Sequence, residues 1–381
     1  MNNHLIFSFI VPFYNRYNKL IRCINSVLQN DNHDTEIVLI DDCSTEKGIE
    51  KLHKYIKDKN ITYKRLIKNK GPGIARSYGI NFAKGDWIFF LDSDDEINSD
   101  VLPQIRRILQ KQKKIDSIFF SKFSRIDNGA TNIVHTSEIN IISSILKSYM
   151  WHIDLCRKIK NTTISQYYNE DACLGGLLLA QCKKSITLDC IFYKYYAYKD
   201  SLVGSLFSQE NLNKFAQANN SSDKFYEQRI EPYLTKKQIN YFQSYLTEVY
   251  FGAFAILYKS NLKLSKNITN KLHFFAQNIT KEIPKFKDKI YLSPCSGINC
   301  GLLLYLQNLL PKCEFSLLDN NPNANSRSIN FAKKMKFSIG ATMEFESKRR
   351  DFVLIYGIHS KAIEAQFIEK GLKRKRDYIV V

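Results

Sequence analysis

The sequence predicts an α/β fold whose N-terminal part is a mostly parallel sheet lying between helices. Three observations support this. Apolar runs alternate with helical patterns over residues 1–120. The runs are continuously apolar, which is typical of strands buried on both faces of a parallel sheet. Polar residues follow each run, at the strand ends where open α/β sheets bind their ligands. We therefore expect several polar loops to meet at one edge of the sheet.

The strands and helices of this part are assigned from their residue patterns. Apolar residues from Leu20 to Leu28 recur with i, i+3, i+4 spacing, which predicts one face of a helix. A weaker helical pattern covers Ile49–Ile56, and a further helix is expected at Ile74–Ala83, with Gly85 as its stop signal. The predicted strands are Leu5–Val11, Glu36–Ile40, Ile61–Leu66, Trp87–Leu91 and Ile118–Phe123.

The rest of the chain divides into two further parts, which gives expected domains at 1–210, 211–285 and 286–381. Residues 211–285 lack strand patterns and are expected to form a helical connector with a basic face. A solvated face is the favoured interpretation of its lysines, and contact with a membrane surface is the alternative. Alternation resumes after residue 286, which predicts a small Rossmann-like α/β domain. Its expected elements are the strands Lys289–Leu292, Glu314–Leu318 and Asp351–Tyr356 and the helix Gly301–Leu310.

Composition restricts the class of protein. The chain has 381 residues and a formal net charge of +19, which favours a polyanionic neighbour such as a phosphorylated substrate, an anionic membrane or nucleic acid. No apolar run reaches the ~18–20 residues of a membrane span. The nine cysteines form no CxxC pair, and no secretory signal is evident, so we expect reduced thiols and a cytoplasmic protein.

An acidic cluster interrupts this basic trend. The stretch FFLDSDDE at 89–96 places four acids directly after an apolar strand. Asp92 and Asp94, two residues apart, offer the oxygen ligands that a hard divalent cation prefers, and magnesium typically takes one or two carboxylates plus substrate phosphates. Taken alone, the same pattern would be a solvated loop that caps the following helix.

The neighbouring motifs favour the metal interpretation. In order along the chain stand VPFYNR at 11–16, DDCS at 41–44, NKGPGIARSYG at 69–79 and FLDSDDE at 90–96. This set resembles the family 2 glycosyltransferases, which have the GT-A nucleotide-sugar-binding fold. Cys43 stands where the family usually has glycine, and Ser77 where it usually has asparagine.

The resemblance implies a role for each matching residue. Asp42 would accept a hydrogen bond from a uracil-type ring, and Asp41 is as well explained by a cap at its strand end. Asp92 would lie by the ribose, and Asp94, together with Asp92, would hold magnesium or manganese at the diphosphate. Asp95 would orient that site. The complete expected nucleotide-sugar set is Pro12, Tyr14, Arg16, Asp42, Asn69, Gly71, Arg76, Asp92 and Ser93.

A general base is also required to deprotonate the acceptor hydroxyl. In the family this base is an acid of a later Glu-Asp pair, which corresponds here to Glu170 and Asp171. We expect Asp171 to be the base and Glu170 to bind the acceptor or to be the alternative base. The resemblance also implies transfer with inversion at the anomeric carbon.

The sequence therefore favours a metal-dependent inverting glycosyltransferase that uses a nucleotide sugar, most simply a UDP-sugar. Its expected acceptor is a glycan or a lipid-linked molecule of cell-surface polysaccharide or lipo-oligosaccharide assembly, with peripheral contact to an anionic membrane. A sugar-nucleotide nucleotidyltransferase is the second candidate, but a Gly-rich basic loop after the first strand is missing. A basic nucleic-acid-binding protein is the third, and it leaves the strand-end motifs unexplained. In the C-terminal domain, Ser293-Pro294-Cys295 replaces the first glycine of a dinucleotide fingerprint, so a structural or acceptor-side role is favoured.

Overall fold

The computed structural model describes most of the chain, and all structural statements concern these residues. They are 5–29, 33–57, 60–112, 114–127, 129–135, 145–159, 169–198, 209–258, 260, 262–285, 287–320, 329, 332–333, 336–342, 345, 348, 350–356 and 360–381. By internal contacts the chain divides into two compact units. Unit 1 comprises residues 1–214 and 224–236, and unit 2 comprises 215–223 and 237–381. The three-part division at 210 and 285 stays a prediction.

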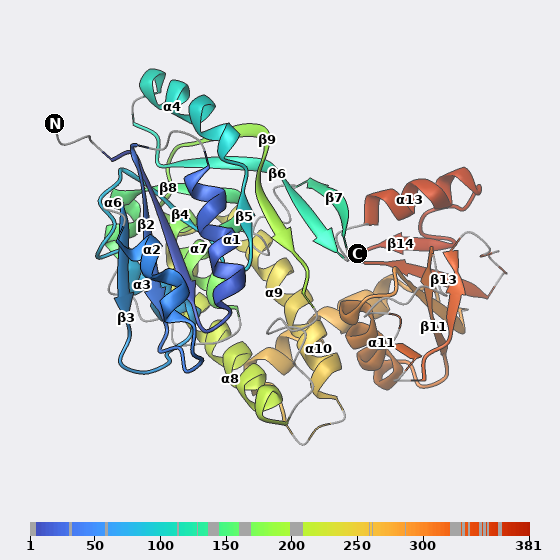
Figure 1. Ribbon diagram of the computed structural model, residues 1–381. Coiled ribbons are helices and arrows are strands. Elements are labelled where there is room, and N and C mark those ends of the chain that lie inside the picture. The colour runs from blue at the N-terminus through green and yellow to red at the C-terminus, as the bar shows by residue number, and fades with distance from the viewer. Residues whose placement is uncertain are drawn as a thin grey trace. The chain divides into compact units, whose positions relative to one another are not determined.

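Unit 1 is built on a nine-stranded sheet with the strand order β3-β2-β1-β4-β8-β6-β9-β5, and β7 pairs with β6 (Figure 1). Strands β1 to β4 are mutually parallel, as expected, whereas β8 runs antiparallel between β4 and β6. The strands are β1 Phe7–Phe13, β2 Thr35–Asp41, β3 Ile61–Arg65, β4 Trp87–Phe90, β5 Glu96–Ile97, β6 Ser117–Asp127, β7 Ala130–His135, β8 Tyr149–His152 and β9 Ser185–Tyr196.

The helices of this unit cover the sheet and connect its strands. Helix α1 turns its apolar side to the core, where Leu20, Ile24 and Val27 are fully buried among the side chains of β1 and β4. The helices are α1 Tyr17–Leu28, α2 His53–Ile56, α3 Pro72–Gly79, α4 Leu102–Lys111, α5 Ile145–Ser148, α6 Ile153–Ile159 and α7 Glu170–Gln181, with the short 3-10 turns Ile49–Leu52 and Ser99–Val101.

The sequence suggested that Gly85 ends a helix, and the structure shows that it does not. Helix α3 already ends at Gly79, and Gly85 lies so close to β1 that an added Cβ would be 2.7 Å from the carbonyl carbon of Phe7. The buried Glu36 accepts hydrogen bonds from Ser8 Oγ (2.6 Å) and from the backbone N–H of Lys84 (2.5 Å). These contacts fix the turn that leads into β4, and β4 carries the acidic cluster at its other end.

Unit 2 contains a separate five-stranded sheet in which all neighbours are parallel, in the order β12-β11-β10-β13-β14. This order confirms the Rossmann-like expectation for the C-terminal part. The strands are β10 Lys289–Ser293, β11 Glu314–Asp319, β12 Ile339–Ala341, β13 Asp351–Ile355 and β14 Tyr378–Val380, and the helices are α11 Gly297–Leu309 and α13 Ser360–Glu369.

The region expected to be helical is helical. It contains α8 Gln209–Phe225, a five-residue π-helix Tyr226–Ile230, a 3-10 turn Glu231–Tyr233, α9 Lys236–Leu257 and α10 Lys266–Glu282. Asp223, which is 2% exposed, joins the helical segments of unit 2. Its carboxylate accepts hydrogen bonds from Tyr250 Oη (3.0 Å), Asn267 Nδ2 (2.7 Å) and Lys271 Nζ (2.7 Å). The sequence pattern gave no indication of this buried carboxylate.

Replacing Gly301 with alanine is expected to destabilise unit 2. The new Cβ would lie 1.9 Å from the carbonyl oxygen of Phe251, so α9 and α11 would have to separate. Such overpacking costs about 1–3 kcal/mol or more. Chemical unfolding followed by circular dichroism measures the change. Gly252→Ala is the matched control on α9, because nothing lies within 4 Å of its added Cβ and an alanine there should stabilise the helix by about 0.5–1 kcal/mol. Equal stability of the Gly301→Ala variant and the wild type would contradict this packing.

Candidate active site

The polar motifs meet at the carboxyl ends of the parallel strands of unit 1. The strand register places Phe13 beside Asp41 and Asp41 beside Arg65, so the loops after β1, β2 and β3 start side by side. β4 lies on the other side of β1, with Phe90 beside Ile10. The four loops that carry the polar motifs, although separate in the sequence, therefore lie at one edge of the sheet (Figure 1).

Asn15 and Asp41 hold the first two loops together. Asn15, in the left-handed backbone region with φ 58°, accepts hydrogen bonds on Oδ1 from the N–H groups of Thr45 (2.9 Å) and Glu46 (3.0 Å). Asp41 is fully buried and accepts hydrogen bonds from the N–H of Ser44 (2.7 Å) and from Tyr63 Oη (2.9 Å). These contacts within the protein match a cap at the strand end, which is one of the two interpretations of Asp41; the other is contact with the ligand.

Asp42 connects the second loop to the third. Its two carboxylate oxygens accept hydrogen bonds from the N–H groups of Lys70 (2.7 Å) and Gly71 (2.8 Å). Gly71 has φ 84°, a conformation that side chains other than glycine rarely adopt. Burial raises the pKa of Asp42 above its ordinary value. The loop of Asn69 and Gly71 is therefore held in place from the end of β2.

The remaining residues of the β1 loop differ in exposure. Pro12 is buried within β1, whereas Tyr14 is 42% exposed, and its hydroxyl lies 3.4 Å from Thr45 Oγ1. Arg16 follows in the left-handed backbone region and extends toward the acidic cluster. Tyr14 is thus available to stack on a flat ring, while Pro12 shapes the strand end.

Each acid of the cluster has its own partner. Asp92 Oδ1 accepts a hydrogen bond from Arg76 Nη2 (2.6 Å), and Asp94 Oδ2 accepts one from Arg16 Nη1 (3.2 Å). The buried Asp95 accepts hydrogen bonds from Tyr193 Oη (2.6 Å) and from the backbone N–H of a second residue of β9 (2.8 Å). Asp95 therefore anchors the loop to β9, and its expected role of orienting the metal site stays a prediction.

Electrostatics distinguishes these carboxyl groups. Burial would raise the pKa of Asp92, but the charges of Arg76 and Lys147 outweigh burial and lower it. Burial and the charge of Asp92 raise the pKa of Asp94 and raise the pKa of Asp95 well above its usual range. Asp92 is thus the stabilised anion of the cluster, whereas for Asp94 burial and the charge of Asp92 outweigh the nearby Arg16 and Lys19.

Lys147 is a site cation that sequence reasoning missed. It lies on the single-turn helix α5, and its Nζ is 3.9 Å from the ring centroid of Tyr195. Although burial opposes its charge, Asp92 and Asp95 raise the pKa of Lys147, and Asp171 contributes in the same direction. No motif marks this position, because a lone lysine outside a pattern reads as solvated.

Arg76 joins the acidic cluster to the Glu-Asp pair. The guanidinium is 5% exposed, and besides Asp92 it binds Glu170 Oε1 through Nη1 at 3.0 Å. Burial and the neighbouring Asp171 raise the pKa of Glu170 to about 7, against the opposing effect of Arg76. Glu170 begins helix α7, and Asp171 follows it in the first turn, where its Oδ1 accepts a hydrogen bond from the N–H of Ala172 (2.8 Å). Residues 16, 76, 92, 94 and 170 are thereby linked in pairs within one site.

Replacing Arg76 with methionine is expected to destabilise unit 1 by up to about 3–5 kcal/mol, because Glu170 and Asp92 would both lose their cation and the buried Glu170 would have to take up a proton. Urea unfolding followed by tryptophan fluorescence measures the change, since Trp87 and Trp151 both lie in this unit. The double variant Arg76→Met/Glu170→Leu should regain much of the loss. A single Arg76→Met variant as stable as the wild type would exclude a structural role for the pair.

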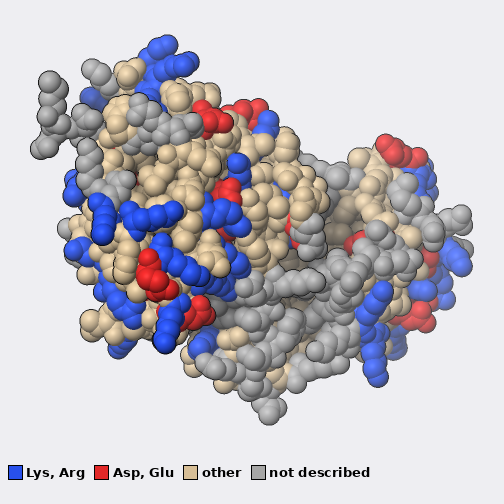
Figure 2. All heavy atoms as spheres, in the orientation of Figure 1, with Lys and Arg blue, Asp and Glu red and all other residues tan. Residues whose placement is uncertain are grey.

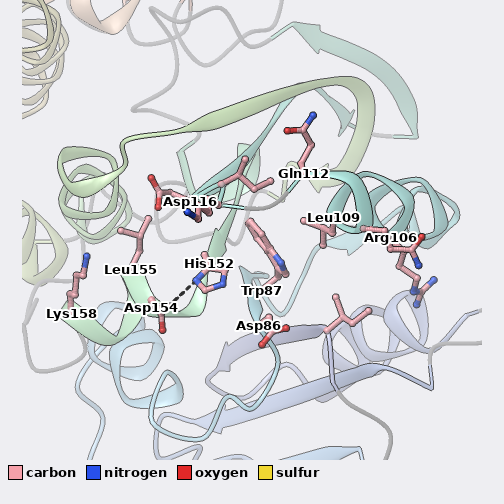
Figure 3. Close-up of a pocket in the computed structure, with 14 residues that line it drawn as sticks. Asp86, Trp87, Arg106, Leu109, Gln112, Asp116, His152, Asp154, Leu155 and Lys158 are labelled. Atoms are coloured by element: carbon pink, nitrogen blue, oxygen red, sulfur yellow. Dashed lines mark hydrogen bonds and ion pairs between the residues drawn. The ribbon is translucent and has the colours of Figure 1, made fainter.

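A separate cavity lies at the opposite edge of the same sheet. It has a volume of about 650 Å³ and is lined by residues at the start of β4, including Asp86 and Trp87, and by Arg106 of α4 (Figure 3). The Trp87 and His152 rings meet edge to face with centroids 5.3 Å apart, and His152 Nδ1 lies 3.5 Å from Asp154. None of the predicted site residues lines this cavity, so it is distinct from the candidate active site.

Comparison with known proteins agrees with this geometry. The sequence model described as "Glycosyl transferase family 2" matches residues 8–163. The succinoglycan biosynthesis protein ExoO of Rhizobium meliloti is 36% identical over 104 residues, which are 27% of this chain and 29% of ExoO. An uncharacterized glycosyltransferase of Haemophilus influenzae is 44% identical over 112 residues, 29% of this chain and 44% of the relative. The chain thus spans less than half the length of these curated relatives.

A solved structure shares the fold. The crystal structure of Staphylococcus aureus TarS 1–349 in complex with UDP-GlcNAc aligns with a TM-score of 0.53 at 19% sequence identity, covering 72% of this chain and 81% of that one. At this identity the likeness concerns the fold alone, and it confirms the predicted GT-A architecture. The strand-end motifs, the family match and the shared fold agree, and residues 8–163 of this chain match the model of the family 2 glycosyltransferases.

Proposed function

We propose that the chain is an inverting glycosyltransferase that moves a sugar from a nucleotide-sugar donor, most simply a UDP-sugar, to a hydroxyl of a glycan acceptor. The observation that carries the proposal is the Arg76 contact pair. One guanidinium binds Asp92 of the strand-end cluster at 2.6 Å and Glu170 of the Glu-Asp pair at 3.0 Å. Two motifs that lie far apart in the sequence are therefore joined by one side chain, which supports a donor site next to an acceptor site.

The donor would lie along the carboxyl ends of β1 to β4. Tyr14 would stack on the base, and Asp42 would accept its ring N–H while still holding the loop of Gly71. Asp92 would accept a hydrogen bond from the ribose, and Arg16 with Lys147 would supply positive charge near the diphosphate. Pro12, Asn69 and Ser93 would border the nucleotide through backbone and small polar groups.

The acidic cluster fits a divalent metal of the magnesium or manganese type. The Asp92 and Asp94 side chains are 33% and 22% exposed, so both can reach a bound ion. Burial, and next the negative charge of Asp92, raise the pKa of Asp94, and a dication at this position would lower the cost of keeping both carboxylates charged. Such an ion is usually bound by one or two carboxylates, and substrate phosphates complete its coordination. When bound, the metal would stabilise the negative charge of the departing diphosphate.

The residues of this chain would then perform a single displacement. Asp171 takes the proton of the acceptor hydroxyl as the acceptor oxygen forms its bond to the anomeric carbon. The bond from that carbon to the diphosphate oxygen breaks with its electron pair, so the configuration inverts. Glu170, held by Arg76, positions the first turn of α7 and thereby Asp171.

The acceptor class rests on the relatives. ExoO is named for succinoglycan biosynthesis, and TarS of Staphylococcus aureus, 37% identical over 99 residues, is named a poly(ribitol-phosphate) β-N-acetylglucosaminyltransferase. That match covers 25% of this chain and 17% of TarS. We infer a cell-surface polysaccharide or a related polymer, assembled from a cytoplasmic donor pool, as the setting of the reaction.

Calorimetric titration of the full chain with UDP and a panel of nucleotide sugars, with and without manganese, tests the donor. We expect metal-dependent binding of UDP and tighter binding of one UDP-sugar, whose slow hydrolysis then identifies the transferred sugar. Steep salt-dependent binding of nucleic acid without any nucleotide-sugar binding would contradict the proposal. Incorporation of nucleoside triphosphate into a sugar nucleotide would favour a nucleotidyltransferase instead.

A further inference from the structure

A hollow with an apolar lining and a basic rim lies in unit 2, between the end of α9 and the start of α10. Its volume is about 490 Å³. Phe254 and Leu257 of α9 and Leu262 and Leu264 of the following link supply its apolar side chains. Tyr258 at its mouth is 46% exposed, although the Tyr258 and Phe254 rings are in edge contact at 5.7 Å. An apolar hollow opening beside an exposed aromatic ring favours a contact partner that is itself apolar.

The rim of this hollow carries lysines without internal partners. Lys263 and Lys266 are exposed, and in the described part of the chain no carboxylate pairs with either ammonium group. Lys271 differs, because its ammonium group is committed to the buried Asp223 at 2.7 Å. Lys263 and Lys266, the two lysines that line the hollow, are therefore available to an anionic partner outside the chain.

Helix α10 continues the same surface. A helical period of 3.6 residues places six positions on one side of α10, and all six are exposed: 266, 270, 273, 274, 277 and 281. Phe274 in this row is 66% exposed and lies on the same side of the helix as Lys266 and Lys281. Lys281 ends the row. The apolar and basic side chains therefore share one face.

We propose that this α9–α10 surface, defined by Tyr258, Lys263, Lys266, Phe274 and Lys281, binds the anionic face of a lipid bilayer. Aromatic rings enter the boundary between headgroups and acyl chains, while lysines keep their ammonium groups among anionic headgroups. The net charge of +19 adds long-range attraction to the same partner. In the described residues no helix is long and apolar enough to cross a membrane.

Charge complementarity selects a bilayer over a protein partner. The cations are lysines spread along a helix and a link, a pattern that suits mobile anionic headgroups better than fixed carboxylates, for which arginine is the geometric match. Figure 2 shows that Lys and Arg side chains are also abundant elsewhere on the molecule. The test must therefore separate this surface from the general basic charge.

Flotation of the full chain with vesicles provides the test. Vesicles of phosphatidylcholine with 30% phosphatidylglycerol are compared with pure phosphatidylcholine, at low salt and at 0.5 M NaCl. We expect binding to the anionic vesicles only, and weaker binding at high salt. Lys263→Gln/Lys266→Gln should lower the partition coefficient about 25-fold, since each lysine near the surface contributes about fivefold. Phe274→Ser should lower binding and leave its salt dependence unchanged.

Matched controls lie in unit 1. Ile133 of β7 is 57% exposed, and Lys57 and Lys111 are exposed lysines, so Ile133→Ser and Lys57→Gln/Lys111→Gln repeat the same chemistry elsewhere. Thermal melting confirms that each variant is folded. Equal losses in the controls would assign binding to general charge and overturn the proposal. Equal binding to neutral and anionic vesicles, or no binding to either kind, would also overturn the proposal. A dimer that is seen in analytical sedimentation and is abolished by Phe274→Ser would overturn it as well. Nucleotide binding is not needed for this result, so the donor proposal is tested separately.

Discussion

Asp171→Asn is expected to lower sugar transfer by about 10²–10⁴-fold while UDP binding stays unchanged. Asparagine keeps the size and the helix-start contact of Asp171 but cannot take the proton of the acceptor hydroxyl. Because Asp171 has no assigned contact to the nucleotide, the donor should bind as before. Rates from a radiolabelled-donor assay and affinities from calorimetry, measured on the same preparations, separate the two effects.

Two variants make this result interpretable. Asp154→Asn changes an aspartate in the first turn of another helix of unit 1, α6, and should leave both transfer and UDP affinity unchanged. Glu170→Gln removes the charge that Arg76 holds at 3.0 Å, so we expect a lower UDP affinity through a displaced Asp92, together with slower transfer. The base would be reassigned to Glu170 if two results were found together. Asp171→Asn would have to keep normal turnover, and Glu170→Gln would have to lose transfer while its UDP affinity stayed unchanged.

The position of the strand-end loops could be predicted from the sequence because it depends on short, local residue patterns. Continuous apolar runs specify buried parallel strands, and the residues after each run lie at the carboxyl edge whatever the remaining topology. The antiparallel strand β8 was not predicted, since four residues carry too little pattern to identify a strand. Helix α3 also ends earlier than expected: after Gly79 the chain continues in tight turns, in which the N–H groups of Asn81 and Phe82 bind the carbonyl oxygens of Tyr78 and Gly79.

Partner choice within the site could not be predicted. The acids of FLDSDDE look equivalent in sequence, yet Asp92 binds Arg76, Asp94 binds Arg16 and Asp95 binds Tyr193. These pairs span 16 to 98 residues, so they depend on how the sheet and helices pack. Arg76 illustrates the consequence. The resemblance implied a place for Arg76 in the nucleotide-sugar set, and the structure adds that its side chain binds two carboxylates from a buried position.

The second large effect is expected at Asp94, where Asp94→Ala should abolish metal-dependent binding of UDP as well as transfer. Manganese tightens UDP binding only if a carboxylate holds the ion against the diphosphate. Asp94 is the candidate because its contact with Arg16, at 3.2 Å, is longer than the 2.6 Å contacts that hold Asp92 to Arg76 and Asp95 to Tyr193. Without it, UDP affinity in manganese should fall to the value measured in a chelator, whereas metal-free affinity should change little or rise as Arg16 is released.

Asp86 provides the matched control, because it directly precedes β4 and thus lies at the opposite end of the strand that carries the cluster. Asp86→Asn should retain the full gain in UDP affinity on adding manganese. If Asp94→Ala also retains that gain, the metal assignment is wrong, and the acidic cluster would serve only to position Arg16 and Arg76. In that case the charge on the departing diphosphate would have to be stabilised by protein cations. Lys147, beside Asp92 and over the Tyr195 ring at 3.9 Å, would be the first to replace.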